Sequence, residues 1–139
     1  MILDTSKPAH EAAAKRLKEE AIIWLTTVNP KGQPQASPVW FLWDGEEFLI
    51  YGSKTGPKTP NIRANPRVSL NLDGDGEGGG VVSVEGTARI DENGPAPAQV
   101  AGFVAKYGAR IESYGWSLDS LARDYPHVIR VAPNKARIW

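Results

Sequence analysis

The chain has 139 residues, in which 16 Lys and Arg balance 16 Asp and Glu, and it contains no cysteine. The balanced charge gives no electrostatic case for binding nucleic acid or a membrane surface, and the lack of cysteine excludes disulfides, thiolate catalysis and cysteine metal ligands. This length predicts one domain over residues 1–139.

The N-terminal sequence has no apolar stretch typical of a signal peptide, and no apolar run approaches the ~20 residues that span a bilayer. We therefore expect no membrane span. A chain without cysteine fits a reducing compartment, and we expect a cytoplasmic protein.

The first element is a helix predicted over residues 8–20, where Ala, Lys, Glu and Arg dominate. Its apolar stripe is thin (Ala9, Ala13 and Leu17), so we expect it to lie across one end of a barrel. A helix that binds a partner protein is the alternative. Residues 22–28 then read as a strand, and the turn residues of Asn29–Gly32 follow it.

The next strand is predicted over residues 35–43 and carries large apolar groups on both faces, so we expect it to be central and covered on both sides. Pro38 has no N–H to donate and marks a bulge or a break in pairing, where a ligand can reach main-chain groups. Asp44-Gly45 is a strong two-residue hairpin signal that leads into a strand ending at Tyr51.

The stretch from Tyr51 to Leu72 is the most informative part of the sequence. A strand runs into a Gly/Ser/Thr loop, a short helix is predicted over residues 60–64, and a second strand begins at Arg67. The stretch contains four cations and no acid. Hydroxyls, lysines and exposed backbone N–H groups at a helix start attract phosphate, so we interpret this loop as a cofactor-phosphate site. The alternative is a basic surface turn.

The second half of the chain adds strands and one longer helix. Residues 67–73 and 81–90 alternate as strands around a glycine-rich acidic loop, which we interpret as a solvated hairpin tip. A helix over residues 95–107 is predicted from a stripe of apolar positions that includes Phe103 and Tyr107, and we interpret this stripe as core packing.

The chain closes with strands predicted over residues 127–132 and 136–139, separated by a turn at Pro133-Asn134. We expect the terminal Trp139 to plug the barrel. The alternative is that it stacks on a ligand.

Together these elements predict a mainly β (α+β) protein with mostly antiparallel strands. Tight turns between strands exclude a doubly wound parallel sheet, which needs long crossovers. The economical way to hide the strand edges is a six-stranded split β-barrel of Greek-key type with short flanking helices.

Other chemistries lack their residues. A nucleotide-hydrolysing P-loop needs four residues between its glycines, but Gly52 and Gly56 have three between them and Pro57 precedes Lys58. No nucleophile elbow surrounds a serine, and two histidines without cysteine do not make a metal site. We assign no catalytic residue and no metal. The remaining option is chemistry carried by a cofactor with a planar ring and an anionic tail.

Five stretches carry a resemblance to a known family: Ile23–Thr27, Gly32–Phe41, Lys58–Leu70, Val84–Ala88 and Ile129–Val131 with Trp139. The chain resembles the pyridoxamine-phosphate-oxidase-like FMN-binding split barrels, and within them the actinobacterial branch that depends on the deazaflavin coenzyme F420. The resemblance covers nearly the whole chain and implies a homodimer with two cofactors at its interface.

By motif position, the resemblance also implies the cofactor-binding residues. Ser37, Pro38, Val39 and Trp40 would border the ring; Ser53, Thr55, Gly56, Lys58 and Thr59 would hold the phosphate; Asn61 would brace the loop; Lys54 and Arg63 would meet a polyglutamate tail; and Trp139 would close the ring pocket from the partner subunit.

The implied activity is hydride transfer between reduced F420 and an unsaturated small organic substrate. FMN-binding relatives usually carry an Arg-Lys pair where this chain has Pro57-Lys58, which removes one bidentate phosphate contact and favours F420 over FMN. An FMN-dependent reductase or oxidase and a cofactor or tetrapyrrole carrier without turnover are the alternatives.

Overall fold

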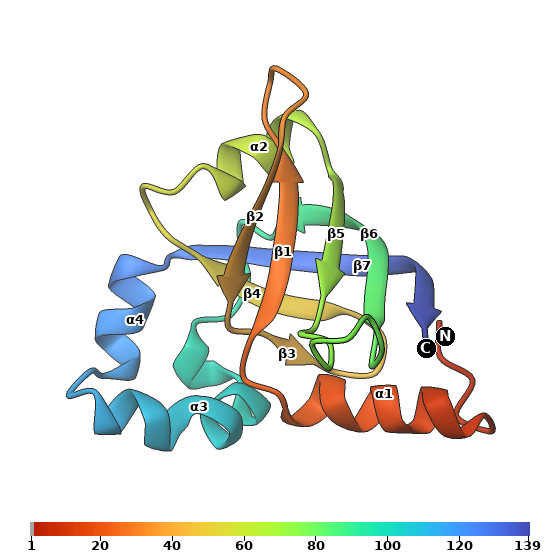
Figure 1. Cartoon of the computed structure of the whole chain (residues 1–139). Helices are drawn as coiled ribbons and strands as arrows, with labels where there is room; N and C mark the ends of the chain where they lie inside the picture. The colour runs from red at the N-terminus through yellow and green to blue at the C-terminus, as the bar shows by residue number, and fades with distance from the viewer. Residues whose placement is uncertain (1) are drawn as a thin grey trace.

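The computed structural model describes residues 2–139 and contains a single antiparallel sheet of seven strands that curls into a half-barrel, with four α-helices around it (Figure 1). The strands are β1 (Ile23–Val28), β2 (Pro34–Val39), β3 (Leu42–Trp43), β4 (Phe48–Gly52), β5 (Arg67–Asn71), β6 (Val82–Ile90) and β7 (His127–Ile138). The helices are α1 (Pro8–Glu19), α2 (Lys58–Ala64), a 3-10 turn (Pro97–Gln99), α3 (Ala101–Ser113) and α4 (Leu118–Asp124).

The strand order is β2-β1-β5-β6-β7-β4-β3, and every neighbouring pair is antiparallel. The prediction of an antiparallel, mainly β fold is confirmed, but the number of strands is seven instead of six. The strand predicted over residues 35–43 forms β2 and the two-residue β3, which pairs with β4, whereas the two strands predicted at the C-terminus form the single strand β7. Because β2 and β3 end the strand order on opposite sides, the short link between them connects the two edges of the sheet.

The strand predicted over residues 35–43 is therefore split, and the break lies at Trp40-Phe41 rather than at Pro38, which still pairs with Trp24 in β1. The strand breaks here because two side chains of α3 form hydrogen bonds with the backbone of Phe41. The backbone N of Phe41 donates to the Tyr107 hydroxyl (2.8 Å), and its carbonyl accepts from Lys106 Nζ (2.8 Å). Both polar groups of Phe41 are satisfied outside a strand ladder.

The expectation that this strand is central is also wrong, because β2 and β3 each lie at an edge of the sheet. β2 is an edge strand, and most of its residues are exposed. Pro34 and Pro38 suit an edge, because proline cannot donate a ladder hydrogen bond.

Several element boundaries differ from those predicted. α2 begins at Lys58 instead of residue 60, and α3 begins at Ala101 after the 3-10 turn instead of at residue 95. The predicted turn at Pro133-Asn134 is wrong. β7 continues through it, with a register shift opposite Glu85 and Gly86. An extra residue taken up as a bulge keeps a strand in its ladder, which a turn does not.

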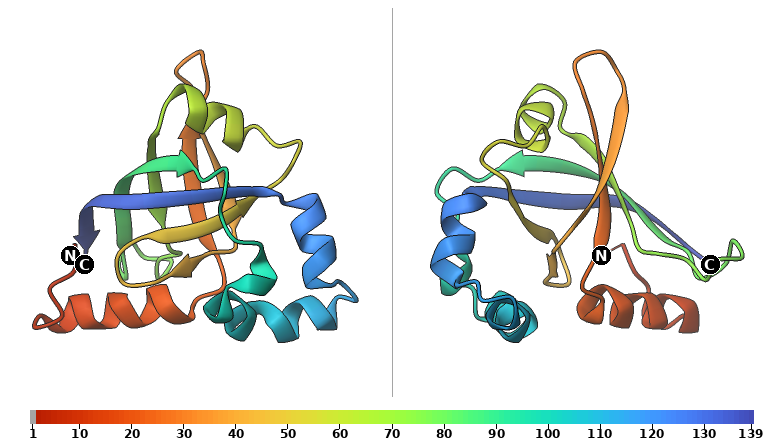
Figure 2. Two further views of the ribbon diagram at one scale, coloured as in Figure 1. Left: turned by 180° about the vertical axis from the view of Figure 1, so that it is seen from behind. Right: turned by 60° about the vertical axis from the view of Figure 1, so that its left-hand side comes forward.

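The core has two parts. The larger cluster fills the curled sheet around Leu25, Phe41, Phe48 and Ile50, and α1 adds Leu17 to it from below. As predicted, α1 lies across one end of the sheet (Figures 1 and 2).

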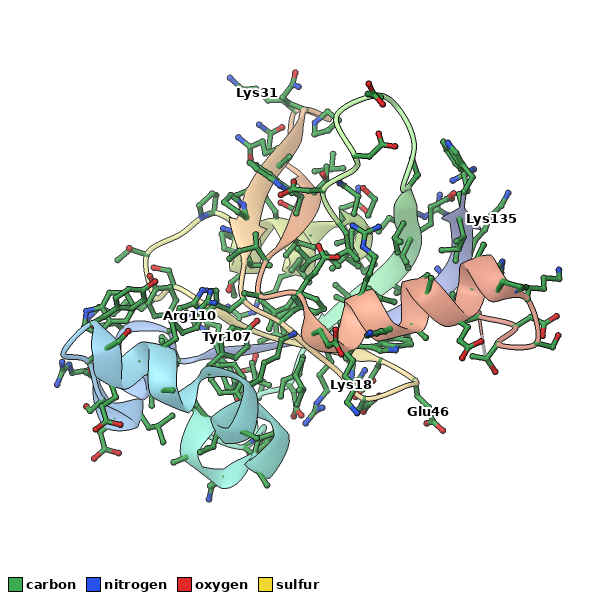
Figure 3. All side chains as sticks on the ribbon, turned by 60° about the horizontal axis from the view of Figure 1, so that its bottom comes forward. Lys18, Lys31, Glu46, Tyr107, Arg110 and Lys135 are labelled. Carbon is green, nitrogen blue, oxygen red and sulfur yellow. The ribbon has the colours of Figure 1, made fainter. Side chains whose placement is uncertain are left out.

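The smaller core cluster lies under α3 and α4. It contains Phe103, Tyr107 and Ile111 from the predicted stripe, together with Leu121. In Figure 3, Tyr107 is seen between α3 and the strands. This cluster forms the base of the site described below.

Two features at the other end of the molecule complete the fold. The acidic loop is a tight turn in which the Asp75 carboxylate accepts from the backbone N of Glu77 and of Gly79, which lowers its pKa. The prediction that Trp139 plugs the barrel is wrong within this chain. Its side chain is 62% exposed, and its indole N–H donates to the Gly78 carbonyl.

Of the helices within residues 2–139, none is both long and apolar enough to cross a bilayer.

Candidate functional site

The candidate site is a cavity of about 390 Å³ between the β2 edge, the end of β4, the start of α2 and the helical pair α3–α4. Its volume is within the range of small-molecule sites. Twelve residues line it: Ile22, Pro38, Val39, Trp40, Tyr51, Gly52, Ser53, Lys58, Phe103, Trp116, Leu121 and Tyr125. The structure thus brings five of the predicted cofactor-binding residues together: Pro38, Val39, Trp40, Ser53 and Lys58.

The flat wall of the cavity is the indole of Trp40. It stacks on the Tyr107 ring at a centroid distance of 4.6 Å and an interplanar angle of 6°. The Tyr107 hydroxyl accepts from the Phe41 backbone N and donates to the Ala21 carbonyl (2.7 Å), and burial raises its pKa to about 12. The Tyr107 hydroxyl therefore has two hydrogen-bond partners and stays protonated at neutral pH. Because the Tyr107 ring is held in place in this way, the Trp40 indole that stacks on it has a defined plane.

Lys106, which directly precedes Tyr107 in α3, also holds the Trp40-Phe41 link in place. Its ammonium group donates to the Phe41 carbonyl and lies 3.7 Å from the centroid of the Phe41 ring. Burial lowers its pKa to about 8, against the smaller opposing effect of Glu20. Lys106 does not line the cavity. It acts on the cavity by holding the link that carries Trp40.

The one charged side chain that lines this cavity is Lys58, the first residue of α2. It is half-buried, and burial lowers its pKa. Among residues 2–139, no carboxylate lies within ion-pair distance of it. A partly desolvated cation without a counter-ion in its own protein favours an anionic ligand.

The loop between Ser53 and Lys58 folds back on itself and opens a second cavity of about 360 Å³. The Ser53 hydroxyl accepts from the backbone N of Thr55 (3.3 Å). Ser53, Lys54 and Thr55 line the second cavity together with Ser120 and Asp124, and Lys54 lies 3.8 Å from the Asp124 carboxylate. Since Ser53, Trp116, Leu121 and Tyr125 line both cavities, the two are adjacent.

Thr59 and Asn61 lie behind the cavity wall. The Asn61 amide is buried and donates to the Thr27 hydroxyl (3.1 Å) and to the side-chain oxygen of Gln35 (3.0 Å), which ties α2 to the β1–β2 hairpin. The Thr59 hydroxyl is buried with no hydrogen-bond partner within the described chain. A Cβ added at Gly52 would lie 3.4 Å from the Thr59 hydroxyl. Because Gly52 has no Cβ, this space between the hydroxyl and the cavity is open.

Four other predicted residues line neither cavity: Ser37, Gly56, Arg63 and Trp139. Arg63 is exposed and pairs with Glu92 at 2.8 Å. His127, at the start of β7, pairs with Gly52 in the cavity lining. Trp139 lies at the other end of this strand. Its contact from a partner subunit stays a prediction.

Sequence reasoning missed the helical wall of the cavity, which consists of Phe103, Trp116, Leu121 and Tyr125. Phe103 and Leu121 belong to helical stripes that pack into the core, and nothing in their spacing distinguishes a cavity wall from buried packing. A usable signal was present in the loop and helix end, where Trp116 and Tyr125 interrupt a polar stretch.

The chain matches the family model described as pyridoxamine 5'-phosphate oxidase over residues 9–139. It belongs to this family. The family includes oxidoreductases, and its fold is the curled antiparallel sheet described above.

Three solved structures show the range of proteins to which this family member is similar. One is an F420 reductase, 28% identical with a TM-score of 0.64 over 88% of this chain and 94% of that one. A FAD-binding protein of Mesorhizobium loti is 22% identical with a TM-score of 0.65 over 91% and 88% of the two chains. HutZ, a heme storage protein of Vibrio cholerae, is 18% identical with a TM-score of 0.64 over 92% and 93%.

Proposed function

We propose that this chain is an F420-dependent oxidoreductase that transfers a hydride between reduced deazaflavin and an unsaturated organic substrate. The observation that carries the proposal is the arrangement of the first cavity. A flat apolar wall at Trp40 faces a space whose lining includes Lys58, a cation with no carboxylate partner among the described residues, and a second, relatively more polar cavity lined by Lys54 lies beside this space. A planar ring with a long anionic tail is the ligand that such a pair of cavities suits.

The residues of the site fit such a cofactor. Lys58 and the Ser53 hydroxyl would hold its phosphate, while Pro38, Val39 and Trp40 would border its ring. The buried Thr59 hydroxyl has no hydrogen-bond partner among residues 2–139 and lies behind Gly52, which suits a polar ligand group or an ordered water at that point. The second cavity gives an extended tail a path past Lys54.

When bound, reduced deazaflavin supplies a hydride to an electron-poor carbon of the acceptor. The protein contributes position and exclusion of water. Tyr107 and Lys106 fix the plane of Trp40, and therefore the plane against which a ring lies.

The described cavity has no dedicated acid. The Tyr51 hydroxyl already donates to the Pro95 carbonyl (2.9 Å), and burial raises its pKa. Solvent or the exposed Tyr125 returns the proton to the product.

The proposal includes a homodimer and a preference for F420 over FMN. Pro57 precedes Lys58 where a second cation would clamp a short phosphate, so phosphate binding relies on one ammonium group. A longer polyanion compensates by reaching Lys54. The similarity to an F420 reductase at 28% identity supports this choice.

The test is a titration of the purified, cofactor-free protein with F420 and with FMN, followed by mixing with reduced cofactor and a series of quinones and enones. We expect tighter binding of F420 and substrate-dependent oxidation of reduced F420. Tighter binding of FMN would mean that FMN, and not F420, is the cofactor of this protein. Tight binding without oxidation by any acceptor would indicate a carrier, a use to which the fold is also suited, since HutZ is a heme storage protein.

A further inference from the structure

The side of the first cavity opposite the β2 edge is built by α3, α4 and the loop between them, and the proposed cofactor contacts do not use it. Phe103 and Leu121 form the buried part of this wall, and Trp116 and Tyr125 form its rim. Figures 1 and 2 show α3 and α4 as a pair that lies beside the curled sheet and not inside it.

The rim is unusually apolar for an exposed surface. Within residues 2–139, the exposed large hydrophobic side chains are Tyr114, Trp116, Tyr125 and Trp139, so three of the four lie in the loop and helix that border the cavity. Trp116 is 52% exposed although its ring lies 4.9 Å from that of Tyr114 and 6.2 Å from that of Trp40. Exposed aromatic groups gathered at a cavity mark a binding surface.

The charge of the cavity restricts what this surface binds. Lys58 is the one charged group in the lining, and the proposed cofactor phosphate neutralises it. No carboxylate or guanidinium group of the described lining faces Trp116 across the cavity, so a charged ligand on that side would be desolvated without a counter-ion. The charged groups that line the second cavity are Lys54 and Asp124, which lie 3.8 Å apart, and Arg123 lies 3.6 Å from the same Asp124 carboxylate.

We propose that Trp116, with Tyr125 in the same cavity lining, is the stacking platform for the second reactant, and that this reactant is a flat, uncharged conjugated ring of the quinone class. The inference rests on the proposed function in one respect, namely that the stacked ring is the hydride acceptor. In that reaction a quinone takes up a hydride and one solvent proton and becomes a hydroquinone, while the cofactor is oxidised by two electrons.

The test is calorimetric titration of the cofactor-free protein with menadione, an uncharged naphthoquinone, in the wild type and in Trp116→Leu, Trp116→Phe and Tyr114→Leu. The chain has no cysteine to which a quinone could add. Loss of a stacking partner in Trp116→Leu is expected to weaken menadione binding roughly 3- to 10-fold. Trp116→Phe keeps a ring and should stay within about twofold of the wild type.

Tyr114→Leu is the matched control, because Tyr114 is equally exposed and lines neither cavity. It should leave menadione binding unchanged. The dissociation constants of F420 and FMN should be the same in all variants. Thermal melting should be unaffected, since Trp116 is half exposed.

Equal menadione affinity in all four proteins would overturn the inference. An equal loss of menadione and cofactor affinity in Trp116→Leu would also overturn it, because the wall would then belong to the cofactor. If neither F420 nor FMN binds the wild type but menadione binding still depends on Trp116, the proposed function fails and the aromatic platform stands.

Discussion

Lys58→Met is the substitution that best separates a cofactor site from a basic surface turn. Methionine keeps an unbranched apolar side chain and removes the charge. In the cofactor-free protein, the lowered pKa of Lys58 shows that the fold disfavours its charged form. We therefore expect the free energy of unfolding to be unchanged or slightly higher in the variant, although a ligand-binding residue has been removed.

With an anionic cofactor the same substitution has the opposite effect. It removes a charge-assisted hydrogen bond from a half-buried group without a carboxylate partner in the described chain, and such bonds contribute about 1.5–3 kcal/mol. This corresponds to a roughly 10- to 150-fold weaker dissociation constant for F420 and for FMN. Lys54→Met is the matched control for FMN, whose short phosphate tail does not reach Lys54 in the proposed arrangement. Lys54 is exposed and already near Asp124, so its loss should cost about 1 kcal/mol or less.

Fluorescence titration with FMN and with riboflavin, which lacks the phosphate, measures the effect directly. The loss of affinity in Lys58→Met should be confined to FMN and F420. If riboflavin binding fell as much as FMN binding, the substitution would be acting on the ring pocket. If FMN and F420 bound the variant as well as the wild type, Lys58 would not be part of the phosphate site.

Three further predictions concern the support of the site. Because burial lowers the Lys106 pKa to about 8, the unfolded chain binds more protons than the folded one above that pH, and stability relative to Lys106→Met should rise from about pH 8 towards the ordinary lysine pKa. Urea unfolding across this range checks the sign, and a falling difference would contradict it. Asn61→Ala leaves the buried Thr27 hydroxyl and the part-buried side-chain oxygen of Gln35 without their donor and should cost about 1–3 kcal/mol in the same assay, whereas no loss would mean that α2 is held by other contacts. Gly86→Ala places a Cβ 2.7 Å from Val131 Cγ1 and 2.9 Å from the Ala132 carbonyl oxygen, so we expect a loss of about 1–3 kcal/mol by thermal or urea melts, and an unchanged melt would mean that the bulge relaxes.

Local chemistry determined much of this protein. Gly32 and Gly45 have positive φ in the turns predicted around them, because glycine accepts that conformation without steric cost. The stripe of Phe103, Tyr107 and Ile111 is buried as predicted, because helical spacing places these side chains on one face. The loop before Lys58 lies at a cavity, as its composition indicated.

The sequence alone did not show which side chains complete the site. The break at Trp40-Phe41 depends on hydrogen bonds from Tyr107, 66 positions later in the chain, and on Lys106 beside it. No local propensity encodes a partner at that separation.

The placement of β2 and β3 at opposite edges of the sheet was also not predicted, and β2 is mostly exposed although its apolar residues suggested a buried strand. The wall at Trp116 likewise exists only because α3 and α4 pack beside Trp40. The sequence by itself determined the turns at Gly32 and Gly45, the buried helical faces and the position of the loop before Lys58, because each depends on neighbouring residues. The tertiary structure decided which aromatic groups face that loop, because that depends on contacts between distant segments.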